Sequence, residues 1–442
     1  MNNLLRTLGI VAAVSAVFAV GFVAFDYLQT RDKFPSPTFI GTVNVSGLTE
    51  KEAAIKLSRY TVAAAYSALL TFEVEQRVFA FSPEQLGLRI NYPESVRQAY
   101  GATHQEGYLR ELGERLQREG AAQLPVFDID EKQLAGIISG VADEIRSTAR
   151  DATIVLYEET GGYHIESEEL GREIKLGETV KEFKRILASG GKTFPILLSY
   201  TDPKVTEKDL RAFPPVYRLA AYTTYYGRHD SPNRIHNIKL VASWIDSTLL
   251  MPGDQFSVAE ALGEVTPERG FKEAFVIVKG ELVPLLGGGS CQIATTLYNS
   301  VQLADLKVMQ RKSHSMYFNI YPLGRDAGVY PGQLDFKFEN DSGHPLLIKA
   351  VATNKRLSFR VYGTPTGKKV EFSAPTVYIL TASGYRPSTV RQVLDADSPF
   401  KTVVTRKVYD AAGKLLKEET INSSYKLYGE KSNVPIARPE PR

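Results

Sequence analysis

The sequence predicts a multidomain α+β protein. We expect a transmembrane N-terminal helix, two duplicated α+β modules, a larger α+β domain with a mostly antiparallel sheet, and a C-terminal β-ribbon. Three observations support this: an uncharged stretch near the N-terminus, a pattern that occurs twice before residue 208, and a glycine run that leads into Cys291, the only cysteine among 442 residues. A chain of this length can form two to four domains. With 43% hydrophobic and 23% charged residues and a formal net charge of +3, its composition excludes disorder and gives no argument for nucleic-acid binding.

The first element is an apolar helix that ends near residue 29. Leu8 to Ala24 contains no charged residue, and with its flanks it reaches the roughly 20 residues that span a bilayer. A signal peptide has a shorter apolar stretch and a small-residue cleavage site, so we expect an uncleaved signal-anchor over residues 1–29 and a stalk over residues 30–39. No second comparable stretch follows. We therefore expect a single-pass protein of the cell membrane, with its C-terminal ectodomain on the extracytoplasmic side.

Two similar modules follow the stalk. Thr49 to Ile55 is repeated in pattern at Asp130 to Ile137, and each combines a helix-capping residue, acids in the first turn and an apolar face. Glu84 to Ile90 is repeated in the same way at Glu168 to Ile174. These repeated patterns predict modules at residues 40–120 and 121–208. No reactive residue recurs between them, which favours a binding or spacer role.

The next segment, residues 209–362, has a different pattern. Ile293, Leu297 and Val301 lie on one face of a helix that begins at Cys291. The remaining expected elements are a hairpin of 274–278 and 282–286 with Lys279, Gly280 and Glu281 between the strands, and strands at 346–351 and 357–362. Alternating residues predict a β-ribbon within 363–433. The proline-rich polar residues 434–442 are expected to be a disordered tail.

The most reactive group that the sequence offers is Cys291. At a helix N-terminus, unpaired N–H groups and the helix dipole stabilise a thiolate. Gly288 and Gly289 allow the backbone to approach a substrate closely, and N–H groups near Cys291 and Gln292 could form an oxyanion hole. The alternative is a glycine turn that is followed by a buried, inert cysteine.

A cysteine nucleophile also needs a base and a group that orients it. His314, directly after the Cys291 helix, is the first candidate for the base, and His236 is the second. Asp326, on a turn, is preferred over Asp335 as the orienting acid. Two basic side chains, Arg234 and Arg325, could bind a substrate carboxylate or form intramolecular ion pairs.

Metal and cofactor chemistry is not indicated. No pair of cysteine and histidine residues has zinc-ligand spacing, and the glycine run lacks the spacing of a phosphate-binding or dinucleotide-binding loop. We therefore expect no metal, no cofactor and no dinucleotide partner.

Seven ordered blocks of residues 209–362 resemble a VanW domain. They are Asn233 to Ile238, Pro252 to Ser257, Glu268 to Ala274, Gly287 to Asn299, His314 to Ser315, Gly324 to Ala327 and Leu334 to Phe336. Ser290 departs from the valine or isoleucine of many members. The two modules resemble the peptidoglycan-binding repeats that precede VanW domains in bacterial envelope proteins, chiefly through the pattern at residues 47–53.

The resemblance implies a function in the cell wall, with peptidoglycan and the membrane as partners. Some VanW-domain proteins are L,D-transpeptidases that form 3→3 peptide cross-links, and their cysteine corresponds to Cys291. On this basis Cys291 would form a thioester with a stem peptide, and His314 would transfer protons. Two alternatives stay open: a non-catalytic peptidoglycan-binding protein linked to glycopeptide resistance, and a cysteine amidase or endopeptidase of the wall.

Overall fold

The protein is described by a computed structural model that covers residues 2–60, 69–104, 108, 112–113, 121–226, 230–278, 281–396 and 398–426. It forms two compact units, Met1–Ala149 with Leu170–Asp202, and Arg150–Glu169 with Pro203–Arg442. Both combine helices with largely antiparallel strands, which confirms the α+β class. Lys279 and Gly280 of the predicted turn and the predicted tail at 434–442 lie outside the described residues, whereas Glu281 is the first residue of the second hairpin strand and not part of the turn.

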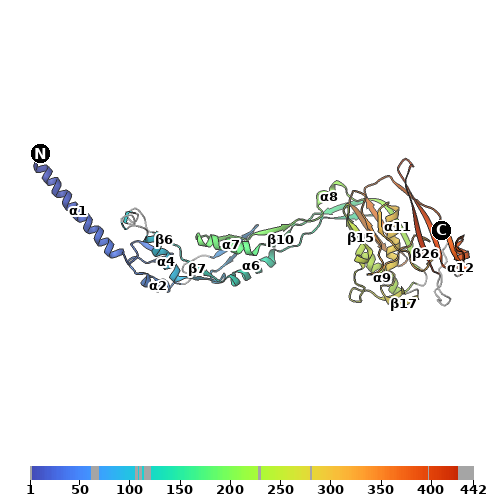
Figure 1. Cartoon of the computed structure of the whole chain (residues 1–442), viewed down its shortest axis with the longest axis horizontal. Coiled ribbons are helices and arrows are strands. Elements are labelled where there is room, and N and C mark those ends of the chain that lie inside the picture. The colour runs from blue at the N-terminus through green and yellow to red at the C-terminus, as the bar shows by residue number, and fades with distance from the viewer. Residues whose placement is uncertain are drawn as a thin grey trace. The chain divides into compact units, whose positions relative to one another are not determined.

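The N-terminal helix α1 (Asn2–Thr30) is drawn in blue in Figure 1. Its segment Leu8–Thr30 is long and apolar enough to cross a membrane, and its large side chains are exposed, with Phe18 at 75%. Such a row of exposed apolar side chains is unfavourable in water. The prediction of one apolar N-terminal helix is thus confirmed, and this helix could serve as a membrane anchor or as a signal sequence.

The first unit contains two hydrophobic cores. One core lies among β1 (Thr38–Ile40), β2 (Val43–Asn44), α2 (Glu50–Leu57) and α4 (Tyr92–Thr103). The other lies among β3 (Leu70–Val74), β4 (Arg77–Phe81), α6 (Glu131–Ile145), α7 (Leu176–Ala188) and β11 (Thr193–Pro195). Thr49 and Asp130 cap α2 and α6 through their side chains, as expected for helix starts.

Strands of the two expected modules pair with each other. β3 is parallel to β11, β5 (Leu88–Ile90) is antiparallel to β7 (Phe127–Ile129), and β1 is parallel to β6 (Ala121–Gln123). β10 (Gly171–Ile174) pairs with β12 (Leu198–Thr201) within the second module. Residues of both segments therefore share sheets, and the division into two duplicated modules stays a prediction.

The second unit is built on a four-stranded antiparallel sheet in the order β13-β21-β20-β14. These strands are β13 (Tyr217–Tyr225), β14 (Thr248–Leu250), β20 (Leu346–Ala352) and β21 (Arg356–Gly363). Helices α9 (Pro232–Ile245) and α11 (Ser290–Leu303) pack side by side against this sheet (Figure 1). The largest core of the chain fills the space between them, so α11 is fixed by its neighbours along most of its length.

Smaller elements surround this core. A three-stranded sheet consists of β15 (Gln255–Ser257), β19 (Lys337–Glu339) and β18 (Lys307–Gln310), and α10 (Val258–Leu262) follows β15. β16 (Glu273–Val278) pairs with β17 (Glu281–Leu286). The hairpin of β8 (Thr153–Tyr157) and β9 (Gly162–Glu166), with α8 (Glu207–Ala212), belongs to this unit. Glu158 anchors the hairpin to β21 through Arg360 and Tyr362.

The C-terminal region forms a five-stranded antiparallel sheet, which we call the C-terminal sheet. Its elements are β22 (Lys369–Phe372), β23 (Thr376–Thr381), β24 (Gly384–Ser388), β25 (Phe400–Tyr409) and β26 (Leu415–Tyr425), with α12 (Val390–Ala396) between β24 and β25. The predicted ribbon corresponds to the long pair β25 and β26. Three further strands extend that pair into a sheet.

Candidate functional site

Cys291 is the second residue of α11. Gly289 caps this helix with a φ of 113°, a conformation that glycine adopts without the steric cost that a side chain would add. The cysteine is partly buried, and its Sγ lies 3.5 Å from the carbonyl oxygen of Val329. The thiol is therefore held at the positive end of the helix dipole, where a thiolate is stabilised.

The rest of α11 is buried on all sides, which the expected single apolar stripe did not predict. Ile293, Leu297 and Val301 are fully buried as predicted. The polar face is buried as well, and Thr295 exchanges hydrogen bonds of 3.0 Å with the backbone of Ala327. Asn299 donates to the Arg325 carbonyl at 2.8 Å. These two contacts fix the loop that carries Asp326 against the helix that carries Cys291.

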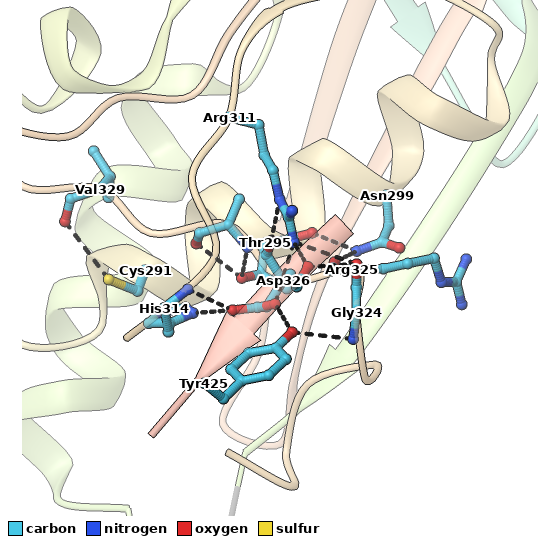
Figure 2. A network of polar contacts seen from close by, with 12 residues as sticks. Cys291, Thr295, Asn299, Arg311, His314, Gly324, Arg325, Asp326, Val329 and Tyr425 are labelled. Atoms are coloured by element: carbon cyan, nitrogen blue, oxygen red, sulfur yellow. Dashed lines mark hydrogen bonds and ion pairs between the residues drawn. The ribbon is translucent and has the colours of Figure 1, made fainter. Parts of the chain in front are cut away.

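His314 lies in the loop after β18 and is 6% exposed. Its Nδ1 lies 2.6 Å from Oδ2 of Asp326, and its backbone N–H donates to the same oxygen at 2.8 Å. A carboxylate can only accept, so Nδ1 carries the proton and the opposite ring nitrogen, Nε2, is the one left for Cys291. The imidazole is near enough to the thiol for each group to shift the pKa of the other. Figure 2 shows the three side chains in sequence: thiol, imidazole and carboxylate.

Asp326 is 3% exposed and both of its oxygens are occupied. On the side away from His314, its Oδ1 accepts a hydrogen bond of 2.5 Å from the hydroxyl of Tyr425. The same oxygen lies 3.3 Å from Nη2 of Arg311, whose Nε also donates to the Asp326 carbonyl at 2.7 Å. The carboxylate is thus bonded in both directions, which fixes its rotation.

Aromatic rings enclose the imidazole. Tyr321 stacks on His314 with the ring centroids 5.1 Å apart and an interplanar angle of 18°, and Phe318 meets the ring edge-on at 5.6 Å. Burial raises the pKa of Tyr321, so this phenol stays neutral. The rings exclude water from one side of the base and leave its edges for Cys291 and Asp326.

The charges of this cluster favour a thiolate beside an imidazolium. Burial alone would raise the pKa of Cys291, but the charge and hydrogen bond of His314, the Val329 contact and the charge of Arg234 bring it below its ordinary value. Burial alone would lower the pKa of His314, but the thiolate and the Asp326 carboxylate raise it to about 10. Both shifts favour the ionised pair over the neutral one.

Asp326 supplies a stable negative charge behind this pair. Burial opposes ionisation of the carboxyl, but hydrogen bonds from His314 and Tyr425 and the charge of Arg311 hold its pKa below the ordinary range. A carboxylate that stays ionised keeps the imidazole in one tautomer. The arrangement can therefore activate a nucleophile and transfer a proton.

The glycine run makes close packing possible. A side chain at Gly288 would lie 2.7 Å from the Phe275 carbonyl oxygen, and one at Gly289 would lie 2.8 Å from Ile238. Asn237 fastens the run from α9 by donating to the Gly288 carbonyl at 3.0 Å. These glycines therefore let β16 and α9 approach the start of α11.

Gln292, near which an oxyanion donor was expected, forms hydrogen bonds within the protein. Its side chain is fully buried and donates to Thr224 at 2.9 Å, and its backbone N–H donates to the Gly289 carbonyl at 2.9 Å. Within the described residues, the N–H of Cys291 forms no backbone hydrogen bond. The oxyanion donor that the helix start offers is therefore the N–H of Cys291.

The two arginines occupy different places. Arg234, on the first turn of α9, forms an ion pair with Asp230 at 2.9 Å, and its charge contributes to the lowered pKa of Cys291. Arg325 lies 4.2 Å from the ring of Phe372, and Figure 2 shows its side chain pointing away from Cys291. Arg234 is therefore the arginine near the thiol.

The second candidates for base and acid hold other parts of the fold. His236 Nε2 lies 2.9 Å from the Gly270 carbonyl oxygen. Asp335 accepts from the Ser257 hydroxyl at 2.6 Å and from the Ala259 N–H at 2.9 Å, where it supports the start of α10. Among the described residues, no group of three or more His, Cys, Asp or Glu side chains could hold a metal ion.

Three contributors to the site were not expected from the sequence. Tyr425 belongs to a strand with no motif, Val329 acts through its backbone, and Arg311 lies three residues before His314. Only Arg311 has a local signal in the sequence, because a charge so close to the histidine can pair with the acid that orients it.

Comparison with known families identifies the domain that holds this site. The family model described as "VanW like protein" matches residues 233–362. This chain contains a VanW-like domain. The VanW-like domain includes Cys291, His314 and Asp326, whereas Tyr425 lies beyond it. A second family model, described as "Putative peptidoglycan binding domain", matches residues 79–195 and crosses the expected boundary between the two modules.

Two curated proteins support the family. Over 148 residues the chain is 41% identical to "Uncharacterized protein YoaR" of Bacillus subtilis, which is 34% of this chain and 48% of that protein. Over 178 residues it is 27% identical to "Vancomycin B-type resistance protein VanW" of Enterococcus faecalis, which is 39% of this chain and 60% of that protein. The match thus spans about half the length of these relatives. No solved structure matches the chain significantly.

Proposed function

We propose that this protein is a membrane-anchored cysteine L,D-transpeptidase that acts on peptidoglycan stem peptides and forms 3→3 cross-links. The observation that carries the proposal is the Cys291–His314–Asp326 chain, in which the thiol and the imidazole shift each other's pKa toward the charged forms and Asp326 lies 2.6 Å from Nδ1 of His314. Such a chain suits acyl transfer, because it combines a nucleophile, a proton carrier and an acid that orients the proton carrier.

The first half-reaction forms a thioester. The Cys291 thiolate attacks the carbonyl carbon of an L-to-D peptide bond in a stem tetrapeptide, and the carbonyl oxygen becomes an oxyanion. When the C–N bond breaks, the imidazolium of His314 gives its Nε2 proton to the leaving nitrogen, and the terminal D-residue departs as an amine. The enzyme is left with a thioester and a neutral imidazole.

The second half-reaction restores the enzyme. A side-chain amine of a second stem attacks the thioester carbonyl, gives one proton to Nε2 of His314 and forms the new amide bond. The sulfur leaves as a thiolate beside the regenerated imidazolium. If water attacks in place of the amine, the same steps yield a cleaved stem, so the acceptor decides between transfer and hydrolysis.

Two groups support the reacting carbonyl in this proposal. The N–H of Cys291 forms no backbone hydrogen bond within the described residues and can donate to the oxyanion at the helix start. Arg234 carries a positive charge near the thiol and can attract the carboxylate of the terminal D-residue. Both contributions depend on the close approach of α9 and α11 that Gly289 permits.

The N-terminal half would bring this site to its substrate. A helix that could act as an anchor precedes a segment with a peptidoglycan-binding match. We infer that α1 stays in the membrane and that the VanW-like domain lies on the extracytoplasmic side, where the wall polymer is. The match to a peptidoglycan-binding domain covers residues 79–195, and we propose that the whole ectodomain acts at the cell wall.

The test incubates the full-length chain, purified in mild detergent, with a disaccharide-tetrapeptide and identifies the products by mass spectrometry. The expected product is a dimer that lacks one terminal D-residue, absent with Cys291→Ser. His314→Gln should reduce the rate by about a hundredfold. A cleaved monomer without a dimer would support the alternative of a cysteine amidase or endopeptidase that hydrolyses the stem peptide. No reaction, together with binding to intact peptidoglycan, would contradict the enzyme and favour a binding protein.

A further inference from the structure

The last strand of the C-terminal sheet reaches the candidate catalytic site. β26 ends at Tyr425, which is 4% exposed, although the strand lies beyond the VanW-like match. The hydroxyl of Tyr425 donates to Oδ1 of Asp326 at 2.5 Å and accepts from the Gly324 N–H at 3.1 Å (Figure 2). One hydroxyl therefore joins the carboxylate to the backbone of its own loop.

The end of β26 is also fixed beside His314. The backbone N–H of Lys426 donates to the Ser315 carbonyl at 2.7 Å, and Lys426 forms a parallel bridge with Met316. The residues directly after His314 are thus held by the same strand end that carries the Tyr425 hydroxyl. The end of β26 therefore contacts both Asp326 and the segment that follows His314.

Further contacts hold the Asp326 loop between the C-terminal sheet and the VanW-like domain. Ser423 donates to the Gly324 carbonyl at 3.1 Å and accepts from Arg311 at 2.9 Å. Arg311 also donates to the Asn422 carbonyl at 3.1 Å. A side chain at Gly324 would come within 2.8 Å of Val404 on β25, which leaves no room between loop and sheet.

We infer that the C-terminal sheet is a component of the catalytic centre, in which Tyr425 is a positioning residue that fixes the Asp326 carboxylate for His314. This inference rests on the proposed function for its consequence in catalysis. Oδ2 of Asp326 accepts hydrogen bonds from the backbone N–H and the ring Nδ1 of His314, and Oδ1 accepts one from Tyr425. A rotation of the carboxylate would therefore break the bonds to both residues.

Arg311 does not replace Tyr425 in this role. Its contact with Oδ1 is 3.3 Å long, whereas its shortest bond, 2.7 Å, goes to the backbone carbonyl of Asp326. Without the Tyr425 hydroxyl, the carboxylate can turn and the Oδ2–Nδ1 bond is formed less often. The imidazolium then loses support, and the thiolate beside it becomes less stable.

The test measures the reactivity of Cys291 directly and does not need a substrate. The rate of alkylation by iodoacetamide is recorded against pH for the full-length chain and for Tyr425→Phe, which removes only the hydroxyl. The midpoint should rise by about one pH unit in Tyr425→Phe. Tyr385→Phe is the matched control, since Tyr385 lies on β24 of the same sheet and is 43% exposed. Its midpoint should not move.

Among the described residues, the charged and titratable groups that surround the Cys291–His314–Asp326 chain include Arg234 of α9 with its partner Asp230, Arg311 after β18, Tyr321 and Tyr425. None of the variants replaces Arg234, Asp230, Arg311 or Tyr321, so these charges stay the same when midpoints are compared. Ser423→Ala is a second variant, which loosens the same loop without touching Asp326 and should move the midpoint in the same direction by less. Thermal unfolding of each variant verifies that the fold is retained.

The outcomes separate this inference from the proposed function. Unchanged or lowered midpoints in both Tyr425→Phe and Ser423→Ala would overturn the positioning role, whatever the cross-linking activity. A raised midpoint in Tyr425→Phe, with no product from stem peptides in the wild-type chain, would support the positioning role and contradict the transpeptidase. A merely structural role predicts a lower unfolding temperature with an unchanged midpoint, and it would also overturn the inference.

Discussion

The carboxylate of Asp326 holds His314 at two points. Its Oδ2 accepts from the backbone N–H of His314 at 2.8 Å and from the ring Nδ1 at 2.6 Å. Because one oxygen fixes both the backbone and the ring, the position of the base and its tautomer are set together. Replacing Asp326 would therefore change both the position of the His314 ring and the negative charge beside it.

Asp326→Asn should therefore weaken the site strongly. The amide has no net charge, and if its NH₂ group faces Nδ1 the imidazole must adopt the opposite tautomer. We expect the pKa of His314 to fall, the alkylation midpoint of Cys291 to rise, and cross-linking to drop by about a hundredfold. Asp335→Asn is the control, because Asp335 is also a buried carboxylate but supports α10. Equal losses in both variants would contradict a special role for Asp326.

The ionised pair predicts different pH profiles for alkylation and for cross-linking. The lowered pKa of Cys291 keeps the thiolate populated below the ordinary thiol value of about 8.5, so alkylation should persist there. The pKa of His314, raised to about 10, means that the imidazolium loses its proton as the pH rises through that value. Cross-linking needs this proton for the leaving amine, so it should fall at high pH while alkylation stays fast.

His314→Gln tests the origin of this behaviour. Without the imidazolium, the largest group that lowers the pKa of Cys291 is lost, and burial then raises the pKa. The alkylation midpoint should move to or above the ordinary thiol value. If it stays where the wild-type chain has it, the helix start and Arg234 would account for the thiolate, and the assignment of His314 would be contradicted. The two titrations are coupled, so the midpoints describe the pair.

The sequence was sufficient to predict those parts of the fold and of the site that depend on residues close together in the chain. The apolar N-terminal helix follows from composition, and the start of α11 at Ser290 follows from the glycine run and the stripe of Ile293, Leu297 and Val301. In the same way, Thr49 and Asp130 marked real helix starts. Each of these is set by residues close together in the chain.

The rest depends on contacts between distant segments. His314 reaches Cys291 because β18 and the Asp326 loop both pack on α11, and nothing in the local spacing predicts that path. Tyr425 arrives from the end of β26, whose alternating pattern is that of any strand. The side chain of Gln292 is held by Thr224 of β13, a residue far away in the sequence. The pairing of β3 with β11, which joins the two expected modules, also depends on residues that lie far apart in the sequence.

Gly289 should tolerate alanine poorly, for two separable reasons. Its φ of 113° is unfavourable for a side chain, and the added Cβ would lie 2.8 Å from Ile238. Gly253 is a matched control with a φ of 88° and no atom within 4 Å of the added Cβ. We expect Gly253→Ala to lower the free energy of unfolding by about 1 kcal/mol and Gly289→Ala by about 3 kcal/mol, measured by urea unfolding. Equal losses would mean that backbone strain alone decides the result.

Arg406 of β25 should be a major link between the C-terminal sheet and α11. Its side chain is 2% exposed and bonds to Asp305 at 2.6 Å, to Glu419 at 2.6 Å and to the Gln302 carbonyl near the end of the helix. Arg406→Met keeps the apolar stem but removes the charge and leaves the Gln302 carbonyl without this donor. Loss of one partner of a buried pair typically costs about 3–5 kcal/mol in the free energy of unfolding.

The matched control for Arg406→Met is Lys407→Met on the same strand. Lys407 pairs with Glu418 at 3.4 Å, and both side chains are about half exposed, so this pair should contribute at most about 1 kcal/mol. If Arg406 holds the sheet on α11, its replacement should also raise the alkylation midpoint of Cys291, because Tyr425 would be less firmly placed. A large loss of stability with an unchanged midpoint would show that Tyr425 keeps its contact with Asp326 independently of the Arg406 link.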